Sequence, residues 1–135
     1  DFYTGPLSSG RRPDEILSEI RFPVRRGRIG TGFQEISPRH GDFALVAVAV
    51  QIERDADGVC SRASVALGGA SPNPVRASEA EAALIGRRID AALANDVSRA
   101  VDAVLSPTDD LHASAAYRRR VARVLAERAI LEAAA

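Results

Sequence analysis

The chain has 135 residues and a mass of 14.3 kDa, a size that fits one domain and leaves little room for two. Eighteen basic and eighteen acidic side chains cancel to zero net charge, so the overall field attracts neither nucleic acid nor an anionic membrane. The longest apolar run, residues 43–50, is far shorter than the roughly twenty residues that span a bilayer. These features exclude a membrane span and argue against nucleic-acid binding.

One cysteine and the absence of lysine narrow the chemistry further. Cys60 alone cannot form an internal disulfide or a multi-thiolate metal site, and a lone thiol is typical of a reducing compartment, so we expect a cytoplasmic protein. All eighteen basic residues are arginine, which excludes a Schiff-base lysine and a phosphate-loop lysine. The two histidines, His40 and His112, are far apart in the chain and have no evident third ligand, so no metal site is expected.

The first third of the chain predicts loops and two short strands. Residues 1–14 are rich in Gly, Pro and Ser, which is typical of a loop. Apolar residues alternate over 16–22 and Pro23 ends the run, which favours an edge strand over the alternative of a single helical turn. The glycines of 27–32 predict a flexible hairpin loop, because a phosphate cradle would need a helix after it. Residues 33–37 predict a second, weak strand.

Two long antiparallel strands form the clearest part of the prediction. Residues 38–42 have the composition of a turn, and the valine-rich stretch 43–53 predicts a central strand. The Asp-Gly pair within 55–58 supplies a residue with positive φ for a hairpin, and 59–67 alternates again as the returning strand. Cys60 lies on this second strand, where we expect a small buried side chain and not a reactive thiol.

Helical periodicity replaces the strand pattern in the last part of the chain. Ser78 and Glu81 predict a capping box for a first helix that ends at Gly86. A second helix is predicted over 89–105, and Ser114 is predicted to cap a third. The apolar side of this third helix is expected to consist of Tyr117, Val121, Val124, Leu125 and Ile130.

The order of these elements predicts the fold class. Strands come first and helices follow, which is typical of an α+β fold. We therefore expect one domain over residues 1–135, with an antiparallel sheet of about four strands followed by three helices packed on one face.

One turn concentrates groups that can contact a ligand. Residues Arg39, His40, Asp42 and Phe43 place a guanidinium, an imidazole, a carboxylate and an aromatic ring on a turn that leads into the most apolar strand. Turns held by a rigid strand often carry ligand contacts. An ordinary Asx turn followed by a core phenylalanine would have the same composition, so the residues alone leave both interpretations open.

Five blocks of sequence occur in the order seen in one family. They are residues 1–6 (DFYTGP), 13–17 with 20–23 (PDEIL, IRFP), 39–44 (RHGDFA), 66–69 with 74–77 (ALGG, PVRA) and 110–119 (DLHASAAYRR). The chain resembles the C-terminal domain of the FAD-binding medium subunit of molybdenum hydroxylases, the carbon monoxide dehydrogenase and xanthine dehydrogenase family. The resemblance covers nearly the whole chain and implies an antiparallel sheet backed by three helices.

The resemblance also implies a place within a larger flavoprotein. In such subunits two preceding domains carry the glycine-rich segments that bind the FAD pyrophosphate, so this chain is expected to be the C-terminal third of a subunit and not catalytic alone. The turn with Arg39, His40, Asp42 and Phe43 would approach the flavin ring of FAD. Phe43 matches a tyrosine of close relatives whose ring lies against the flavin. The molybdenum cofactor and the iron–sulfur clusters are implied on partner subunits.

Two functional interpretations follow. The first is a flavin-covering and subunit-docking domain, in contact with the preceding FAD-binding domains, an iron–sulfur subunit and a molybdenum subunit, in an enzyme that passes electrons from a molybdenum centre through iron–sulfur clusters to FAD. The alternative is a free-standing interaction or dimerisation module that shares the fold without a cofactor. Glycine-rich FAD-binding segments encoded before Asp1 would favour the first, and a start codon there would favour the second.

Overall fold

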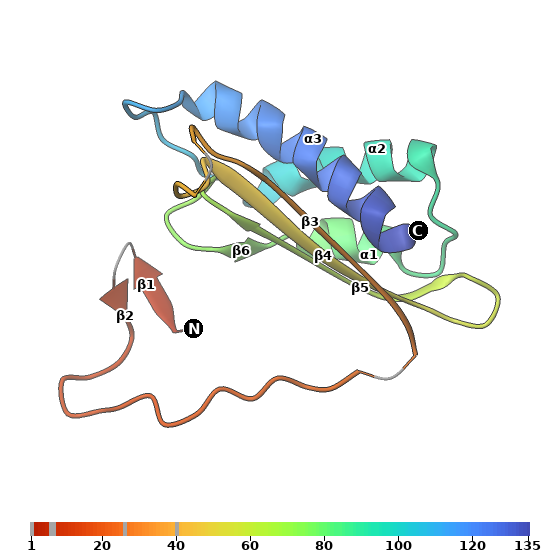
Figure 1. The fold of residues 1–135 in the computed structure, drawn as a ribbon, viewed down its shortest axis with the longest axis horizontal. Helices are drawn as coiled ribbons and strands as arrows, with labels where there is room; N and C mark the ends of the chain where they lie inside the picture. The colour runs from red at the N-terminus through yellow and green to blue at the C-terminus, as the bar shows by residue number, and fades with distance from the viewer. Residues whose placement is uncertain (1, 6–7, 26, 40) are drawn as a thin grey trace.

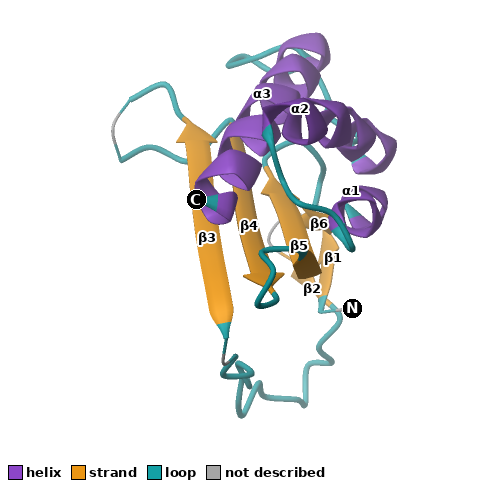
Figure 2. Ribbon diagram, turned by 90° about the vertical axis from the view of Figure 1, so that its right-hand side faces the viewer, coloured by secondary structure: helices purple, strands orange, loops and turns teal. Residues whose placement is uncertain are grey.

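A twisted antiparallel sheet with helices on one of its two faces is the frame of the computed structural model, which describes residues 2–5, 8–25, 27–39 and 41–135 (Figures 1 and 2). The elements are, in chain order, β1 (Tyr3–Gly5), β2 (Ser8–Ser9), β3 (Arg28–Ile36), β4 (Val46–Arg54), β5 (Cys60–Gly68), β6 (Val75–Arg76), α1 (Ser78–Leu84), α2 (Ala91–Ala100), the 3-10 helix η1 (Val101–Val104) and α3 (Ala115–Ala134). The α+β class with three helices on one face is confirmed. None of the helices in the described ranges is long and apolar enough to cross a membrane.

The main sheet has four strands in the order β3-β4-β5-β6, but its fourth strand is not the predicted one. Residues 16–22 form neither strand nor helix, and Ile16 and Phe22 are 87% and 82% exposed. The prediction of an edge strand there was wrong because alternation gives a strand only where a neighbouring strand takes up the backbone hydrogen bonds. The short strand β6 pairs with β5 in its place.

The glycine-rich run 27–32 is not the predicted hairpin loop. From Arg28 onward it belongs to β3, which pairs with β4 from Arg28↔Arg54 to Ile36↔Val46. A Cβ built at Gly30 or Gly32 would overlap the carbonyl oxygens of Ala133 and Ala129 in α3. Glycine is present here because strand and helix backbones lie in contact, not because the chain turns.

The hairpin between the two long strands forms as predicted. Gly58 has φ +79°, and the Asp55 carboxylate accepts hydrogen bonds from the backbone N–H groups of Asp57 and Val59, both at 2.9 Å. Arg54 pairs with Cys60 and Glu53 pairs with Arg62, so one residue of β5 bulges out of the ladder. The bulge turns Cys60 toward the helices, where its side chain is buried as expected and burial raises the pKa of its thiol.

Two of the predicted helix starts differ in detail. The predicted capping box is wrong, since Ala77 is the N-cap of α1 and no side chain caps it. The Glu81 carboxylate instead accepts the backbone N–H of Val65 at 2.9 Å and pairs with Arg76 at 2.7 Å, which joins α1 to β5 and β6. The second helix begins after Asp90, whose carboxylate accepts from the N–H of Leu93, and it tightens into η1 before Pro107.

Helix α3 begins as predicted, and Leu125 and Ile130 of the predicted apolar side are buried, but Val124 is not. The Ser114 hydroxyl accepts the N–H of Tyr117 at 3.2 Å and caps the helix. Val124, predicted on the apolar side, is 43% exposed. The buried side consists mainly of small residues, namely Ala122, Ala126, Ala129 and Ala133 with Leu125 and Ile130. Alanine allows the helix to approach the glycines of β3, which a row of large side chains would prevent.

The hydrophobic core lies between the sheet and the helices. Every second residue of β4 from Val46 to Ile52 points into it and is at most 4% exposed, and β5 adds three more after the bulge. These side chains are Val46, Val48, Val50, Ile52, Ala63, Val65 and Leu67. The opposite face of the sheet carries no helix (Figure 2).

Replacing Gly32 with alanine should test the contact between β3 and α3. The new Cβ would overlap the backbone of Ala129, so Gly32→Ala should lower the free energy of unfolding by at least about 2 kcal/mol. Gly68→Ala is the matched control, because no atom lies within 4 Å of a Cβ at that strand position and alanine there should be neutral or slightly stabilising. Equal melting temperatures for the two variants would contradict the direct backbone contact.

Candidate functional site

The connection between β3 and β4 forms a defined turn that presents the predicted site residues. The N–H of Asp42 donates to the carbonyl oxygen of Arg39 at 3.1 Å, and the N–H of Leu45 donates to that of Ile36 at 2.8 Å. Gly41 has φ +88°, a backbone conformation that favours glycine. We call residues 37–45 the β3–β4 turn.

The structure brings three of the four predicted residues together at the surface. Arg39 and Asp42 form an exposed ion pair with 3.9 Å between Nε and Oδ2, a distance and an exposure at which such pairs contribute little stability. Phe43 is 98% exposed, so the interpretation as a core phenylalanine was wrong. His40 lies outside the residues that the structure describes.

A buried arginine of α3 holds the base of this turn. The Arg118 side chain is 8% exposed, and its guanidinium donates to the carbonyl oxygens of Leu45 at 2.5 Å and Gly69 at 2.9 Å. Its other nitrogen donates to the Asp110 carboxylate at 2.6 Å. Gly69 has φ +77°, and a Cβ there would lie 2.5 Å from the Leu45 oxygen. Arg118 therefore fixes the β3–β4 turn to the β5–β6 connection and to the segment before α3.

Asp110 is fixed in turn by the backbone that precedes α3. Its carboxylate accepts the N–H groups of Ala113 and His112, each at 2.9 Å. These two hydrogen bonds, together with the positive charge of Arg118, hold the pKa of Asp110 below its usual value. The carboxylate is therefore charged at neutral pH and keeps its pairing with Arg118.

The sequence alone does not indicate this pair, because Arg118, Arg119 and Arg120 are consecutive and nothing in their pattern shows which one is buried. Arg118 follows the Ser114 cap by one helical turn. That position indicates burial only once the carbonyl oxygens of Leu45 and Gly69 are known to lie beside it.

The turn forms one wall of a groove of about 450 Å³. Its lining consists of Pro38, Asp42, Phe43, Ala44, Leu45, Asp110, His112 and Arg118. An exposed aromatic ring beside such a groove can stack on a planar ligand. Among the described residues no group of three His, Cys, Asp or Glu side chains could hold a metal ion. The arrangement supports a contact surface for a ligand, not a catalytic constellation.

The comparisons with known proteins agree with this picture. The family model described as CO dehydrogenase flavoprotein C-terminal domain matches residues 31–133. The chain is 36% identical to caffeine dehydrogenase subunit beta of Pseudomonas sp. (strain CBB1), a match over 99% of the chain and 45% of that protein. It is 30% identical to the carbon monoxide dehydrogenase medium chain of Afipia carboxidovorans, a match over 100% of the chain and 46% of that protein.

Solved structures show the same fold. CO dehydrogenase from Oligotropha carboxidovorans matches with a TM-score of 0.91, and quinoline 2-oxidoreductase from Pseudomonas putida 86 with 0.89, each at 30% identity. In both cases the match covers 99% of this chain and 46% of the solved chain. The chain spans about half the length of the relatives that it matches.

Arg118→Lys should loosen the β3–β4 turn, because an ammonium group cannot reproduce the guanidinium fork between two carbonyl oxygens and a carboxylate. We expect a loss of about 1–3 kcal/mol in the free energy of unfolding and faster amide hydrogen exchange over residues 37–45. Arg119→Lys is the control, since Arg119 also donates to two carbonyl oxygens, those of Asp102 and Leu105, but at η1. Equal exchange over 37–45 in both variants would show that Arg118 does not hold the turn.

The pairing of Asp110 should give a pH-dependent contribution to stability. Because the folded state lowers the pKa of Asp110, its contribution is complete above the usual carboxyl pKa and is lost as the pH falls through the lower folded value. The melting temperature of the wild-type chain should therefore exceed that of Asp110→Asn at pH 7, and the difference should shrink on acidification through the carboxyl range. A difference that stays constant down to pH 3 would contradict this linkage.

Proposed function

Because this chain belongs to the CO dehydrogenase flavoprotein C-terminal domain family, we propose that it covers the flavin in the FAD-binding subunit of a molybdenum-containing hydroxylase or dehydrogenase. The observation that carries the proposal is Phe43, an aromatic ring almost fully exposed on a turn whose base is held by a buried arginine. A large apolar side chain in water is unfavourable unless a partner covers it. A flat ring such as the isoalloxazine of FAD is a suitable partner.

The groove beside Phe43 fits a contact with the flavin ring and not with the whole cofactor. We assign Arg39 and Asp42 of this turn to the same proposed contact surface, and His40 from its place in the sequence alone. The glycine-rich run 27–32 lies within or next to β3, and two of its glycines contact the backbone of α3, so it is not a pyrophosphate cradle. FAD retention therefore belongs to the preceding FAD-binding domains of the same subunit, and this chain by itself should hold FAD weakly or not at all.

In this proposal the residues of this chain position and cover the flavin ring, and none of them takes part in the reaction. Bound FAD supplies the redox chemistry of the subunit. Phe43 excludes water from the part of the ring that it covers, and Arg118 keeps the turn in place through Leu45. The partner subunits of the proposed cytoplasmic assembly carry the iron–sulfur clusters and the molybdenum cofactor, from which electrons reach FAD.

Phe43→Ala tests the proposed flavin contact in the flavin-loaded subunit that contains this chain. Loss of the ring should change the absorption and fluorescence of the flavin, because its surroundings become wetter. Stability should change by less than about 0.5 kcal/mol, since Phe43 is 98% exposed within this domain. Val124→Ala, which removes an exposed apolar side chain from α3, is the control and should leave the spectrum unchanged. A Phe43→Ala spectrum identical to the wild type would overturn the assignment.

A further inference from the structure

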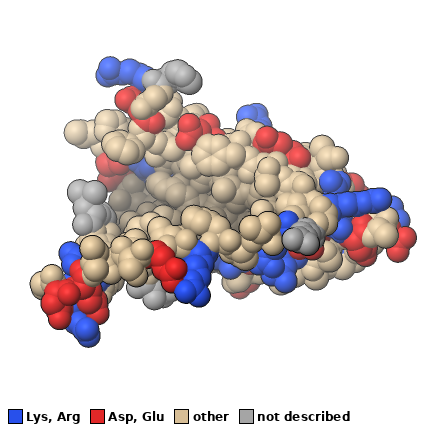
Figure 3. Space-filling view, turned by 60° about the horizontal axis from the view of Figure 1, so that its bottom comes forward, with Lys and Arg blue, Asp and Glu red and all other residues tan. Residues whose placement is uncertain are grey.

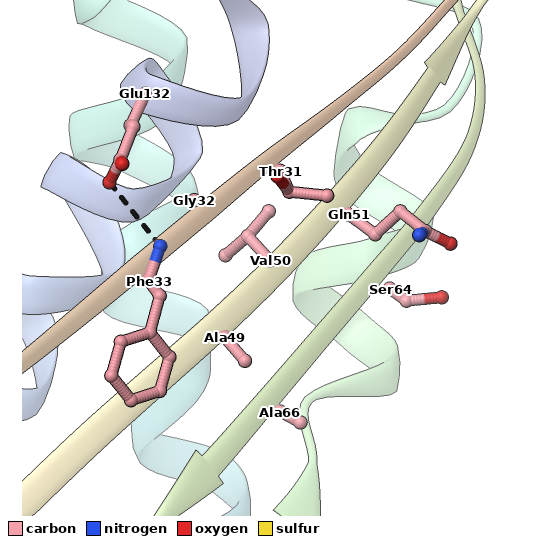
Figure 4. A pocket seen from close by; sticks show the side chains of 9 residues that line it. All are labelled: Thr31, Gly32, Phe33, Ala49, Val50, Gln51, Ser64, Ala66 and Glu132. Carbon is pink, nitrogen blue, oxygen red and sulfur yellow. Dashed lines mark hydrogen bonds between the residues drawn. The ribbon is translucent and has the colours of Figure 1, made fainter.

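The face of the sheet that points away from the helices has the composition of an interface. Three neighbouring strands contribute small or uncharged side chains, and one aromatic ring, Phe33, is 58% exposed there. The uncharged members of this open face are Thr31, Phe33, Ala47, Ala49, Gln51, Ser64, Ala66 and Gly68. Six of them, all except Ala47 and Gly68, line a shallow hollow of about 490 Å³ (Figure 4). Charged residues lie at the margins of the face: Glu35 is opposite Ala47, Arg76 is opposite Ala66, and Glu53 pairs with Arg62 at 3.9 Å.

An extended segment with five exposed apolar side chains runs beneath this open face without packing on it. We call residues 11–24 the strap; it forms neither helix nor strand. Its apolar side chains are between 51% and 90% exposed, namely Ile16, Leu17, Ile20, Phe22 and Val24. Its charged side chains bind within the strap itself, as Arg12 does with Glu15 at 2.9 Å and Arg21 with Glu19 at 2.6 Å.

The strap and the open face bound a hollow on the same side of the molecule. The strap passes below the sheet in Figure 1, and the surface is visibly hollowed there when this side is turned forward in Figure 3. The exposed apolar side chains of the strap, and Phe33 on the open face, are more stable when packed against a neighbouring surface, because burial removes their apolar area from water. Because the strap stays apart from the sheet, we expect another part of the protein to fill the hollow between the strap and the open face.

The solved relatives indicate which occupant this is. The match to CO dehydrogenase from Oligotropha carboxidovorans covers 99% of this chain, strap included, with a TM-score of 0.91, yet it covers only 46% of the solved chain. The strap thus follows a similar course in a polypeptide that contains about as much chain again. Since few contacts within this domain fix the strap, the additional chain is the part that holds it in place.

We infer that the strap and the open face are the two walls of a seat for the flavin-binding part of the same subunit, which offers an uncharged, apolar surface to both. The inference rests on the proposed function and assigns its docking surface. A second copy of this chain fits less well, because the strap lies in front of the sheet. The free edge of β3 is also partly covered, since the Glu132 carboxylate accepts the N–H of Phe33 at 3.3 Å (Figure 4). The same carboxylate accepts the Gln34 amide at 2.8 Å.

Hydroxyl-radical footprinting of the flavin-free subunit and of the 135-residue chain tests this seat. Phe33 on the open face and Phe22 on the strap should both be oxidised severalfold more slowly in the subunit, while Val124 on the outer side of α3 reacts equally in both. Equal oxidation of Phe33 and Phe22 in the two proteins would overturn the inference. Protection that appears in the 135-residue chain as its concentration rises would also overturn it, by assigning the face to self-association.

A charge on the open face gives a second, independent measurement. Ala49→Glu should leave the melting temperature of the 135-residue chain nearly unchanged, because residue 49 points to solvent there, but it should lower that of the subunit and remove the protection of Phe33. Val124→Glu is the matched control and should lower neither. Equal melting temperatures of wild-type and Ala49→Glu subunits would contradict the seat.

The flavin measurement separates this inference from the proposed function. Protection of Phe33 and Phe22 in a subunit whose flavin spectrum ignores Phe43→Ala would leave the seat standing and overturn the flavin contact. A spectrum that responds to Phe43→Ala without protection of Phe33 and Phe22 would do the reverse.

Discussion

Strand β3 and helix α3 lie backbone against backbone, with no side chain between them at Gly30 and Gly32. This contact fixes the direction of α3, whose last turn lies over the beginning of β3 and whose first turn lies at the far end of the strand (Figure 1). Arg118 is in that first turn, which is why it reaches the carbonyl oxygen of Leu45 at the end of the β3–β4 turn. The position of the candidate site thus depends on Gly30 and Gly32, which lie away from the site but set the direction of α3.

The two faces of the sheet have different roles: one packs against the helices and stabilises the fold, and the other is available for contact with a partner. The face toward the helices carries the large buried side chains of β4 and β5. The opposite face carries Phe33 and mostly alanine, serine, threonine and glutamine, with charged side chains at its margins. Small side chains leave room for a partner surface and limit the apolar area exposed in its absence. The exposed rings of Phe33 and Phe43, which no core contact explains, lie on the open face and on the β3–β4 turn.

Several local patterns are present in the sequence but did not form the structure that they predicted. The alternation over 16–22 is real, but no strand lies beside it, and it forms part of an extended strap. The spacing of Ser78 and Glu81 is that of a capping box, yet the Glu81 carboxylate accepts the N–H of Val65 in the neighbouring strand β5. Glycines at 30 and 32 suggested flexibility and instead mark a direct backbone contact between β3 and α3. Each error concerns a group whose partner is distant in the chain.

The sequence by itself determined the α+β class, the long hairpin with positive φ at Gly58, the cap of α3 at Ser114 and the turn that carries Phe43. These features depend on residues within one turn or one strand of each other, so periodicity and turn chemistry are sufficient to predict them. Only the tertiary structure decided that Phe43 is exposed, that Arg118 is buried and that β6 completes the sheet. Those outcomes depend on hydrogen bonds and close contacts between segments far apart in the chain, which no local pattern contains.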